Sequence, residues 1–313
     1  MGSGSRTKQY ERRFFQGEQK HEEKEEETFN IIKTLGAYEV REANGGYELL
    51  KNGEVVGTFC EAKVEEKRII FKLSHGMNLE VSEKGVREIL SPEKAELCGL
   101  IASDGCVCKY QSKKGKSTGY EVSLTTVDPE LAEVFDKLAR EVYSIAPHHY
   151  IRHHKTKEGE KPHLKVALLR RNIAMDLWLL GIKGPEPYEF HPPTRYLDEE
   201  GKRAYLRGFF SGDGNVSVGK ENDHNIRIYS TCEEGLKELR NLFVDLGFNP
   251  SAVYLDNEEI VPGKSRRKSY YFSILEKDHL KFIEEIGSEK LEHISKLNLI
   301  RLIDEGKRKR REK

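Results

Sequence analysis

The sequence predicts an α+β protein, in which a pseudo-two-fold pair of αββαββα units follows a small N-terminal β-rich accessory domain. Three observations lead to this fold class. A segment of eleven residues recurs 109 positions downstream, both copies lie in helix-like segments with a stripe of small residues, and both precede the same succession of strand-like and helix-like patterns. The length of 313 residues suits about two domains.

Residues 1–90 are expected to form the accessory domain, with residues 1–5 as a leader outside the fold. The charged stretch 6–34 ends in apolar residues, as a surface helix would, and Gly36 is expected to stop it. Short β-type runs separated by glycine-containing turns then predict antiparallel hairpins over residues 37–90. No pattern in this domain indicates a chemistry.

The internal repeat defines the remainder of the chain. Leu97–Val107 returns as Leu206–Val216 with five of eleven positions identical. In each copy, an opening helix precedes two strands, a helix, two more strands and a closing helix. One copy alone would leave a sheet face partly uncovered, so the copies are expected to pack together. The expected segments are a first repeat at 91–183, a proline-rich linker at 184–197, a second repeat at 198–300 and a basic C-terminal tail at 301–313.

Small residues recur at every fourth position of the two opening helices. Glycine inside a helix costs about 1 kcal/mol, so two helices that both contain it need a packing reason. We expect the two stripes to face each other and to let the helix backbones approach closely. The predicted interface consists of Ala95, Gly99, Ser103, Ala204, Gly208 and Gly212.

Two aspartates, Asp104 and Asp213, follow these stripes at the carboxyl ends of the helices. A carboxylate there faces the negative end of the helix dipole and a second carboxylate across the interface, which is unfavourable unless a cation is bound. Carboxylate and carbonyl oxygens suit magnesium and not zinc. The predicted metal site therefore joins both aspartates to the preceding Ser103 and Gly212. An Asp-Gly pair taken alone is more often an ordinary turn, but its recurrence in both repeats beyond a small-residue stripe favours the metal site.

The segments Leu97–Gly105 and Leu206–Gly214 resemble the two signature helices of single-chain LAGLIDADG homing endonucleases, and the likeness covers about residues 91–300. The resemblance implies a saddle of two antiparallel sheets and a monomer that hydrolyses both strands of a double-stranded DNA target site, leaving 3′ overhangs. It implies that Asp104 and Asp213, which match the family's metal-binding acids, hold Mg²⁺ or Mn²⁺ near the scissile phosphates while water attacks in line.

Basic and amide side chains on the predicted strands are expected to contact DNA, because the major groove admits β-ribbons. In a two-residue period Lys109, Gln111 and Lys113 share one face, which is expected to read bases while the opposite face packs. An ordinary solvated surface is the alternative for each basic strand. Zinc binding by the histidines of 148–154 is disfavoured, since adjacent histidines on a strand point to opposite faces. The predicted set adds Lys114, Lys116, His149, Arg152, His154, Arg227, Arg266, Arg267 and Lys268.

A catalytic lysine is missing where the resemblance would place polar or basic helpers, because the strand ends carry Thr126-Val127 and Thr231-Cys232. Lys183 and Lys290 are positional substitutes, with a surface role as the alternative for both. The missing lysine keeps a second function open. In that alternative the protein is a cleavage-silent DNA-binding regulator, or an RNA maturase that aids splicing and has intron RNA as its partner.

The overall charge is zero, with 53 Lys and Arg against 53 Asp and Glu. Residues 1–90 hold 15 basic and 17 acidic residues, so the remainder carries a small basic excess, gathered in hairpins and the tail. Five cysteines without a Cys-x-x-Cys pair favour a reducing compartment. No apolar run is long enough for a membrane span. With a Lys and Glu richness typical of thermophiles, these features predict a cytoplasmic, nucleoid-associated prokaryotic protein, with a thermophilic archaeon as the suggested source.

Overall fold

The computed structural model describes residues 31–43, 45–111, 118–156, 159–182, 189–219, 224–259 and 267–311, and it divides into a compact unit that ends at Thr58 and a larger one that begins at Phe59. The smaller unit contains an antiparallel sheet of order β1-β2-β3-β4, with strands Ile31–Leu35, Tyr38–Ala43, Gly46–Lys51 and Glu54–Phe59, the last of which ends one residue beyond the division.

The helix expected over residues 6–34 is wrong at its C-terminal end. Ile31–Leu35 is strand β1, which pairs with β2 and buries Leu35. The β-branched side chains of Ile31 and Ile32 favour this extended conformation. Residues 6–30 lie outside the described part of the chain.

A second antiparallel sheet belongs to the larger unit. Its order is β5-β6-β7-β8, with strands Ala62–Val64, Arg68–Lys72, Met77–Ser82 and Gly85–Leu90. Arg68 on β6 donates hydrogen bonds to Glu80 at 2.9 Å and to Asp198 of the second repeat at 2.6 Å. Leu90 joins the core of the repeats. The division at Thr58 therefore differs from the expected boundary at residue 90, because these contacts join β5–β8 to the repeats.

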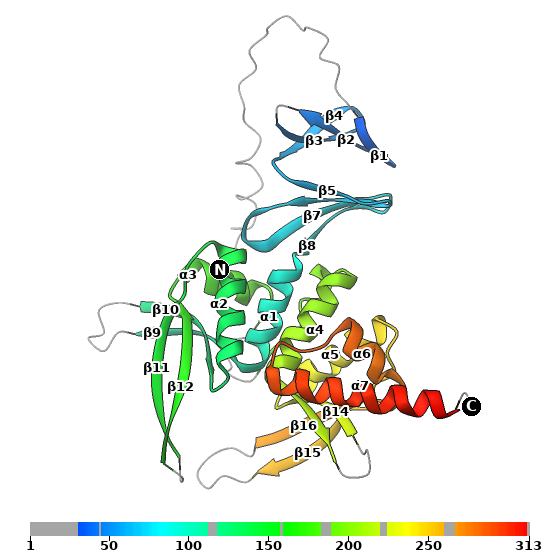
Figure 1. The fold of residues 1–313 in the computed structure, drawn as a ribbon. Helices are drawn as coiled ribbons and strands as arrows, with labels where there is room; N and C mark the ends of the chain where they lie inside the picture. The colour runs from blue at the N-terminus through cyan, green and yellow to red at the C-terminus, as the bar shows by residue number, and fades with distance from the viewer. Residues whose placement is uncertain are drawn as a thin grey trace, which may run out of the picture. The chain divides into compact units, whose positions relative to one another are not determined.

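The expected pair of αββαββα units is confirmed (Figure 1). The first unit contains α1 (Pro92–Asp104), β9 (Gly105–Gln111), β10 (Thr118–Thr126), α2 (Pro129–Tyr143), β11 (His148–Thr156), β12 (Gly159–Leu168) and α3 (Arg171–Leu179). The second contains α4 (Glu199–Asp213), β13 (Gly214–Val218), β14 (His224–Ser230), α5 (Glu233–Asp245), β15 (Tyr254–Glu259), β16 (Arg267–Ile274) and α6 (His279–Glu285). Their sheets have equivalent orders, β9-β10-β12-β11 and β13-β14-β16-β15.

Helix caps explain where the two opening helices begin. The side chain of Ser91 accepts a hydrogen bond from the backbone nitrogen of Lys94 at the start of α1. Asp198 does the same for Gly201 at the start of α4, at 2.8 Å. Both caps satisfy backbone donors that the first helical turn leaves unpaired.

Both segments that flank the second repeat are more structured than expected. Within the described part of the proline-rich linker, Phe190 is buried and packs against Phe209, with ring centroids 5.0 Å apart. The expected basic tail belongs to a helix, α7 (Leu291–Arg311), because Leu297, Ile300 and Asp304 are buried and hold it against the second repeat. None of the helices in the described ranges is long and apolar enough to cross a membrane.

Candidate nucleic-acid interface

Helices α1 and α4 lie side by side between the two sheets (Figure 1). A Cβ atom on Gly99 would lie 2.0 Å from the carbonyl oxygen of Tyr205, and one on Gly208 would lie 2.1 Å from that of Glu96. A Cβ on Gly212 would lie 2.2 Å from Oγ of Ser103. The structure thus brings both predicted stripes together, including the buried Ala95 and Ala204.

The close approach places the two predicted acids at the same end of the helix pair. Asp104 is exposed and Asp213 half-buried, each as the last residue of its helix. A Cβ on Gly212 would lie 3.3 Å from the carboxyl carbon of Asp104, so this carboxyl group lies beside the end of α4.

Lys290 supplies a cation near this end. Its Nζ lies 2.8 Å from a carboxylate oxygen of Asp128. Burial opposes the charged form, but the hydrogen bond to Asp128 and the charges of Asp128, Glu292 and Asp104 together raise the pKa of Lys290. Lys290 is therefore a fixed cation at neutral pH. The other proposed substitute, Lys183, lies outside the described residues.

The donors at this end of α1 and α4 fit a hard cation. They comprise the carboxylates of Asp104 and Asp213 and the backbone oxygens near Ser103 and Gly212. Mg²⁺ commonly binds through one or two carboxylates plus substrate phosphates. Over the described ranges, the two aspartates belong to no group of three His, Cys, Asp or Glu ligands. Water or DNA phosphate would have to complete the coordination.

The side chains at the strand ends without a lysine accept hydrogen bonds from backbone nitrogens. Oγ1 of the buried Thr126 accepts a hydrogen bond from the backbone nitrogen of Asp128, at the start of α2, at 3.0 Å. Sγ of Cys232 accepts one from the nitrogen of Gly235, at the start of α5, at 3.4 Å. Cys232 is thus the N-cap of α5, whereas Thr126 holds Asp128, the residue that precedes α2. Both side chains are directed toward the backbone by these hydrogen bonds.

Each sheet has an apolar face, which packs against helices, and an opposite face that we call its polar face. On β9, Lys109 and Gln111 lie on the same side as the buried Val107, and Lys109 pairs with Tyr120, whose ring packs against Trp178 of α3. The prediction that these residues form the base-reading face is therefore wrong, because β9 pairs without a bulge and its period of two is unbroken. The polar face of β9 carries Cys106, Cys108 and Tyr110.

Strand β11 divides the other predicted contacts of the first repeat. His149 points toward the helices, since its Nε2 lies 2.8 Å from a carboxylate oxygen of Asp136 on α2. Arg152 lies on the polar face and is exposed. Lys113, Lys114, Lys116 and the side chain of His154 lie outside the described part.

Sequence reasoning missed the basic residues of β12 on the same polar face. Lys161, His163 and Lys165 alternate along this strand, and His163 lies opposite Arg152. Lys165 is buried and pairs with Glu121 of β10. The alternation is visible in the sequence as Lys-Pro-His-Leu-Lys and could have identified this strand.

The polar face of the second sheet carries Arg227 together with amide and tyrosine side chains. Arg227, a predicted DNA contact, lies on this face. Its guanidinium lies over the ring of Tyr271, 5.0 Å from the ring centroid. Lys268 lies on the opposite, helix-packed side, whereas Arg266 and the side chain of Arg267 lie outside the described part. The missed members of this face include Asn215, Ser217, Asn225, Tyr229, Tyr254 and Asn257. The sequence did not indicate these residues, because the short strands that carry them contain few Lys and Arg residues.

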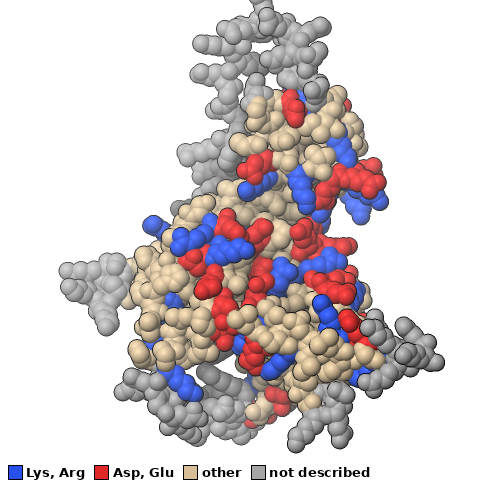
Figure 2. Space-filling view, viewed as in Figure 1, with Lys and Arg blue, Asp and Glu red and all other residues tan. Residues whose placement is uncertain are grey.

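Charges of both signs are intermixed over the side of the molecule shown in Figure 2. An ion pair bridges the helix seam, where Arg207 of α4 donates to Glu96 of α1 at 2.8 Å. Burial raises the pKa of Glu96 against the opposing effect of Arg207. Ion pairs of this kind engage acidic and basic side chains with each other, so these charges cancel locally as well as in the net charge.

The chain belongs to the LAGLIDADG-like domain family, whose pattern it matches over residues 91–171 and 200–287. The two matched segments correspond to the two repeats of the structure.

Curated relatives carry the name probable cell division protein WhiA. The chain is 27% identical over 171 residues to the one from Leuconostoc citreum, which covers 49% of this chain and 51% of the relative. It is 26% identical over 157 residues to one from Staphylococcus epidermidis, covering 49% of this chain and 48% of the relative. The chain thus spans about half the length of these relatives.

Solved structures with a similar fold include I-DmoI in complex with DNA and Mn, with a TM-score of 0.45, 19% identity, and coverage of 63% of this chain and 96% of the other. I-WcaI bound to its DNA recognition sequence has a TM-score of 0.43, 16% identity, and coverage of 66% and 85%. A full-length DUF199/WhiA protein from Thermatoga maritima has a TM-score of 0.41, 18% identity, and coverage of 67% and 60%.

Proposed function

We propose that this protein is a sequence-selective double-stranded DNA-binding regulator built on a LAGLIDADG scaffold, and that it binds DNA without cutting it. The observation that carries the proposal is the pair of polar faces. They present Arg152 and His163 on one sheet and Arg227 with several asparagines on the other. Arginine and asparagine are the side chains best suited to paired hydrogen bonds with guanine and adenine edges.

Three features favour a regulator over a nuclease. Thr126 and Cys232 at the strand ends accept hydrogen bonds from backbone nitrogens at the starts of α2 and α5. Lys290 is held by an ion pair with Asp128, which competes with a role at a phosphate. The curated relatives are named as probable cell division proteins and not as nucleases, which also favours a role other than DNA cleavage.

A site-specific endonuclease is the second candidate, and the position of the two acids favours it. Asp104 lies beside the end of α4, so its carboxylate and that of Asp213 are suited to hold metal together at a central seam. When bound, Mg²⁺ or Mn²⁺ would activate water and stabilise the negative charge of the phosphate. In this candidate Lys290 stabilises the same charge from its fixed position near Asp104.

The test begins with selection of bound duplexes from a random library, followed by affinity measurements with the selected duplex, a scrambled duplex and a structured intron RNA. We expect the selected duplex to bind at least about 1,000-fold more tightly than the scrambled one. Equal affinity for all duplexes, or a preference for RNA, would contradict the proposal.

Cleavage is measured on the selected duplex, in a supercoiled plasmid with Mg²⁺ or Mn²⁺. We expect neither nicking nor linearisation. If the plasmid is cut, the variants Asp104→Asn and Asp213→Asn should bind the duplex as the wild type does and lose double-strand cleavage, which would establish the nuclease instead.

A further inference from the structure

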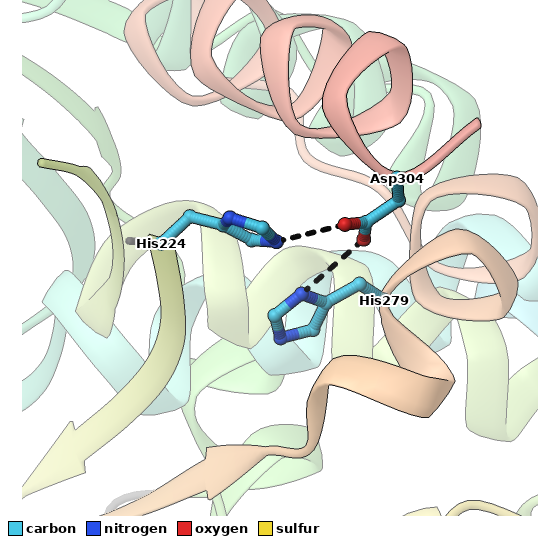
Figure 3. A group of neighbouring side chains, drawn as sticks. All are labelled: His224, His279 and Asp304. Carbon is cyan, nitrogen blue, oxygen red and sulfur yellow. Dashed lines mark ion pairs between the residues drawn. The ribbon is translucent and has the colours of Figure 1, made fainter. Parts of the chain in front are cut away.

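A buried cluster of two histidines and an aspartate lies where the C-terminal helix α7 packs against the second repeat. His224 begins β14, His279 begins α6, and Asp304 lies on α7. Figure 3 shows both rings converging on the carboxylate. Nε2 of His224 lies 3.1 Å from Oδ1 of Asp304, and Nδ1 of His279 lies 3.8 Å from Oδ2. The side chains are 2%, 2% and 8% exposed, in the order His224, His279 and Asp304.

The orientation of His279 is fixed by its other ring nitrogen. Nε2 lies 3.0 Å from the carbonyl oxygen of Ile274, a contact that requires a proton on Nε2. A neutral ring then has its lone pair on Nδ1, aimed at the carboxylate of Asp304. Metal-binding histidines usually donate their second N–H to a carbonyl or carboxylate in this way.

Hydrogen bonds within the cluster do not pair all of its buried polar atoms. Among the residues that the structure describes, Nδ1 of His279 and both carboxylate oxygens of Asp304 are buried without a hydrogen-bond partner. A second proton on His279 would supply a donor, but it would place a charged imidazole in a site where this side chain is only 2% exposed. A lone pair facing a buried carboxylate is repulsive, and a cation between the two removes the repulsion.

We propose that His224, His279 and Asp304 form a binding site for a divalent transition metal, with Zn²⁺ as the preferred ion. Two imidazole nitrogens and one carboxylate oxygen are ligands typical of zinc. Tetrahedral bonds of the usual lengths would separate these ligand atoms by roughly 3.3–3.5 Å. The observed separations are close to this value, at 3.1 Å from His224 to Oδ1 and 3.8 Å from His279 to Oδ2 of the same carboxylate, and the three ligand atoms lie within 4.8 Å of one another. A water molecule would take the fourth position.

The site would fasten the C-terminal helix to the second repeat. Its three ligands come from the sheet, from α6 and from α7, which are brought together only by folding. Nearby charges are compatible with it, because Lys307 lies 3.8 Å from Oδ1 of Asp304 but is engaged by Glu276 at 2.8 Å. The proposal is independent of whether the protein binds or cuts DNA.

The test uses the full chain without a polyhistidine tag, freed of metal with a chelator and dialysed against Zn²⁺. We expect one equivalent of zinc per chain, and with Co²⁺ the visible absorption bands of a four-coordinate site. Asp304→Asn and His279→Gln should each weaken zinc binding by more than about 100-fold. The matched control is His191→Gln, at an exposed histidine that pairs with Glu238, and it should bind zinc as the wild type does.

Wild-type protein that retains less than a tenth of an equivalent of zinc and gives no cobalt bands would overturn the proposal. Unchanged zinc affinity in Asp304→Asn would do the same. Circular dichroism establishes whether each variant folds. If a variant does not fold, the stoichiometry and cobalt spectrum of the wild type still decide. Limited proteolysis with and without zinc adds a separate measurement, in which zinc should slow cleavage within α7.

Discussion

His293 lies at the start of α7 in surroundings that disfavour its charged form. Its side chain is buried beside Phe210, and its Nδ1 lies 3.1 Å from Oγ of Ser288. Burial, with a smaller effect of the charge of Lys290, lowers the pKa of His293 to about 4. The native state therefore keeps this histidine neutral at pH values where the unfolded chain protonates it.

This difference predicts a pH-dependent loss of stability. Because the folded pKa lies below the unfolded value of 6.5, the contribution is fully present above pH 6.5 and is lost as pH falls toward about 4. The loss can reach about 3 kcal/mol. The free energy of unfolding is measured with urea for the wild type and for His293→Asn, from pH 7.5 down to pH 4. It should decrease less with falling pH in the variant than in the wild type. Parallel profiles would contradict this account of His293.

The pairing of α1 with α4 depends on backbone contact, and this gives a prediction for the helix pair. A Cβ on Gly208 would lie 2.1 Å from the carbonyl oxygen of Glu96 and 2.9 Å from the nitrogen of Leu100. Since both neighbours are backbone atoms of a packed helix, Gly208→Ala should force the helices apart and reduce the free energy of unfolding by about 3 kcal/mol or more. Thermal and denaturant unfolding measure this loss.

Gly306 supplies the matched control for that substitution. It lies within helix α7, and a Cβ there would meet nothing within 4 Å among the described atoms. Alanine has the higher helix propensity, so Gly306→Ala should raise stability by up to about 1 kcal/mol. A similar loss in both variants would show that the effect at Gly208 does not come from the contact between helices.

At the scale of elements, the sequence pattern predicts the helices and strands whose formation depends on neighbouring residues. The stripes Ala95–Ser103 and Ala204–Gly212 predict a close helix pair, and hairpin turns predict strands of correct order. The face that a strand presents was less predictable. Lys109 looks like a DNA contact in the sequence, yet register with Tyr120 places it on the helix side. A shift of one residue in strand register moves a side chain to the opposite face of the sheet, and the charge of a residue does not determine that register.

The cluster of His224, His279 and Asp304 could not be predicted from the sequence, because its members are separated by 55 and 25 positions and meet only in the tertiary fold. No short spacing of ligands marks it. Similarly, Ile31–Leu35 follows a helix-like charged run but pairs as a strand, since partners in the sheet override local propensity.

For the whole molecule, a net charge of zero is compatible with DNA binding only if the contacts are made by particular faces. The basic and amide residues of the two polar faces alternate with residues that pack against helices. Affinity should therefore depend on which side of a strand a positive charge occupies, and not on the total charge of the protein.

This dependence is tested with paired substitutions that remove one charge from each face. Arg227→Met and Arg152→Met, on the polar faces, should each weaken binding of the selected duplex about tenfold or more and reduce the slope of log affinity against log salt by about 0.9 for each phosphate that the variant no longer neutralises. Lys268→Met and Lys109→Met remove the same charge on the helix sides of the two sheets and should stay within about twofold of the wild type. Equal reductions in affinity in all four variants would mean that binding follows net charge, which would overturn the assignment of the polar faces to DNA.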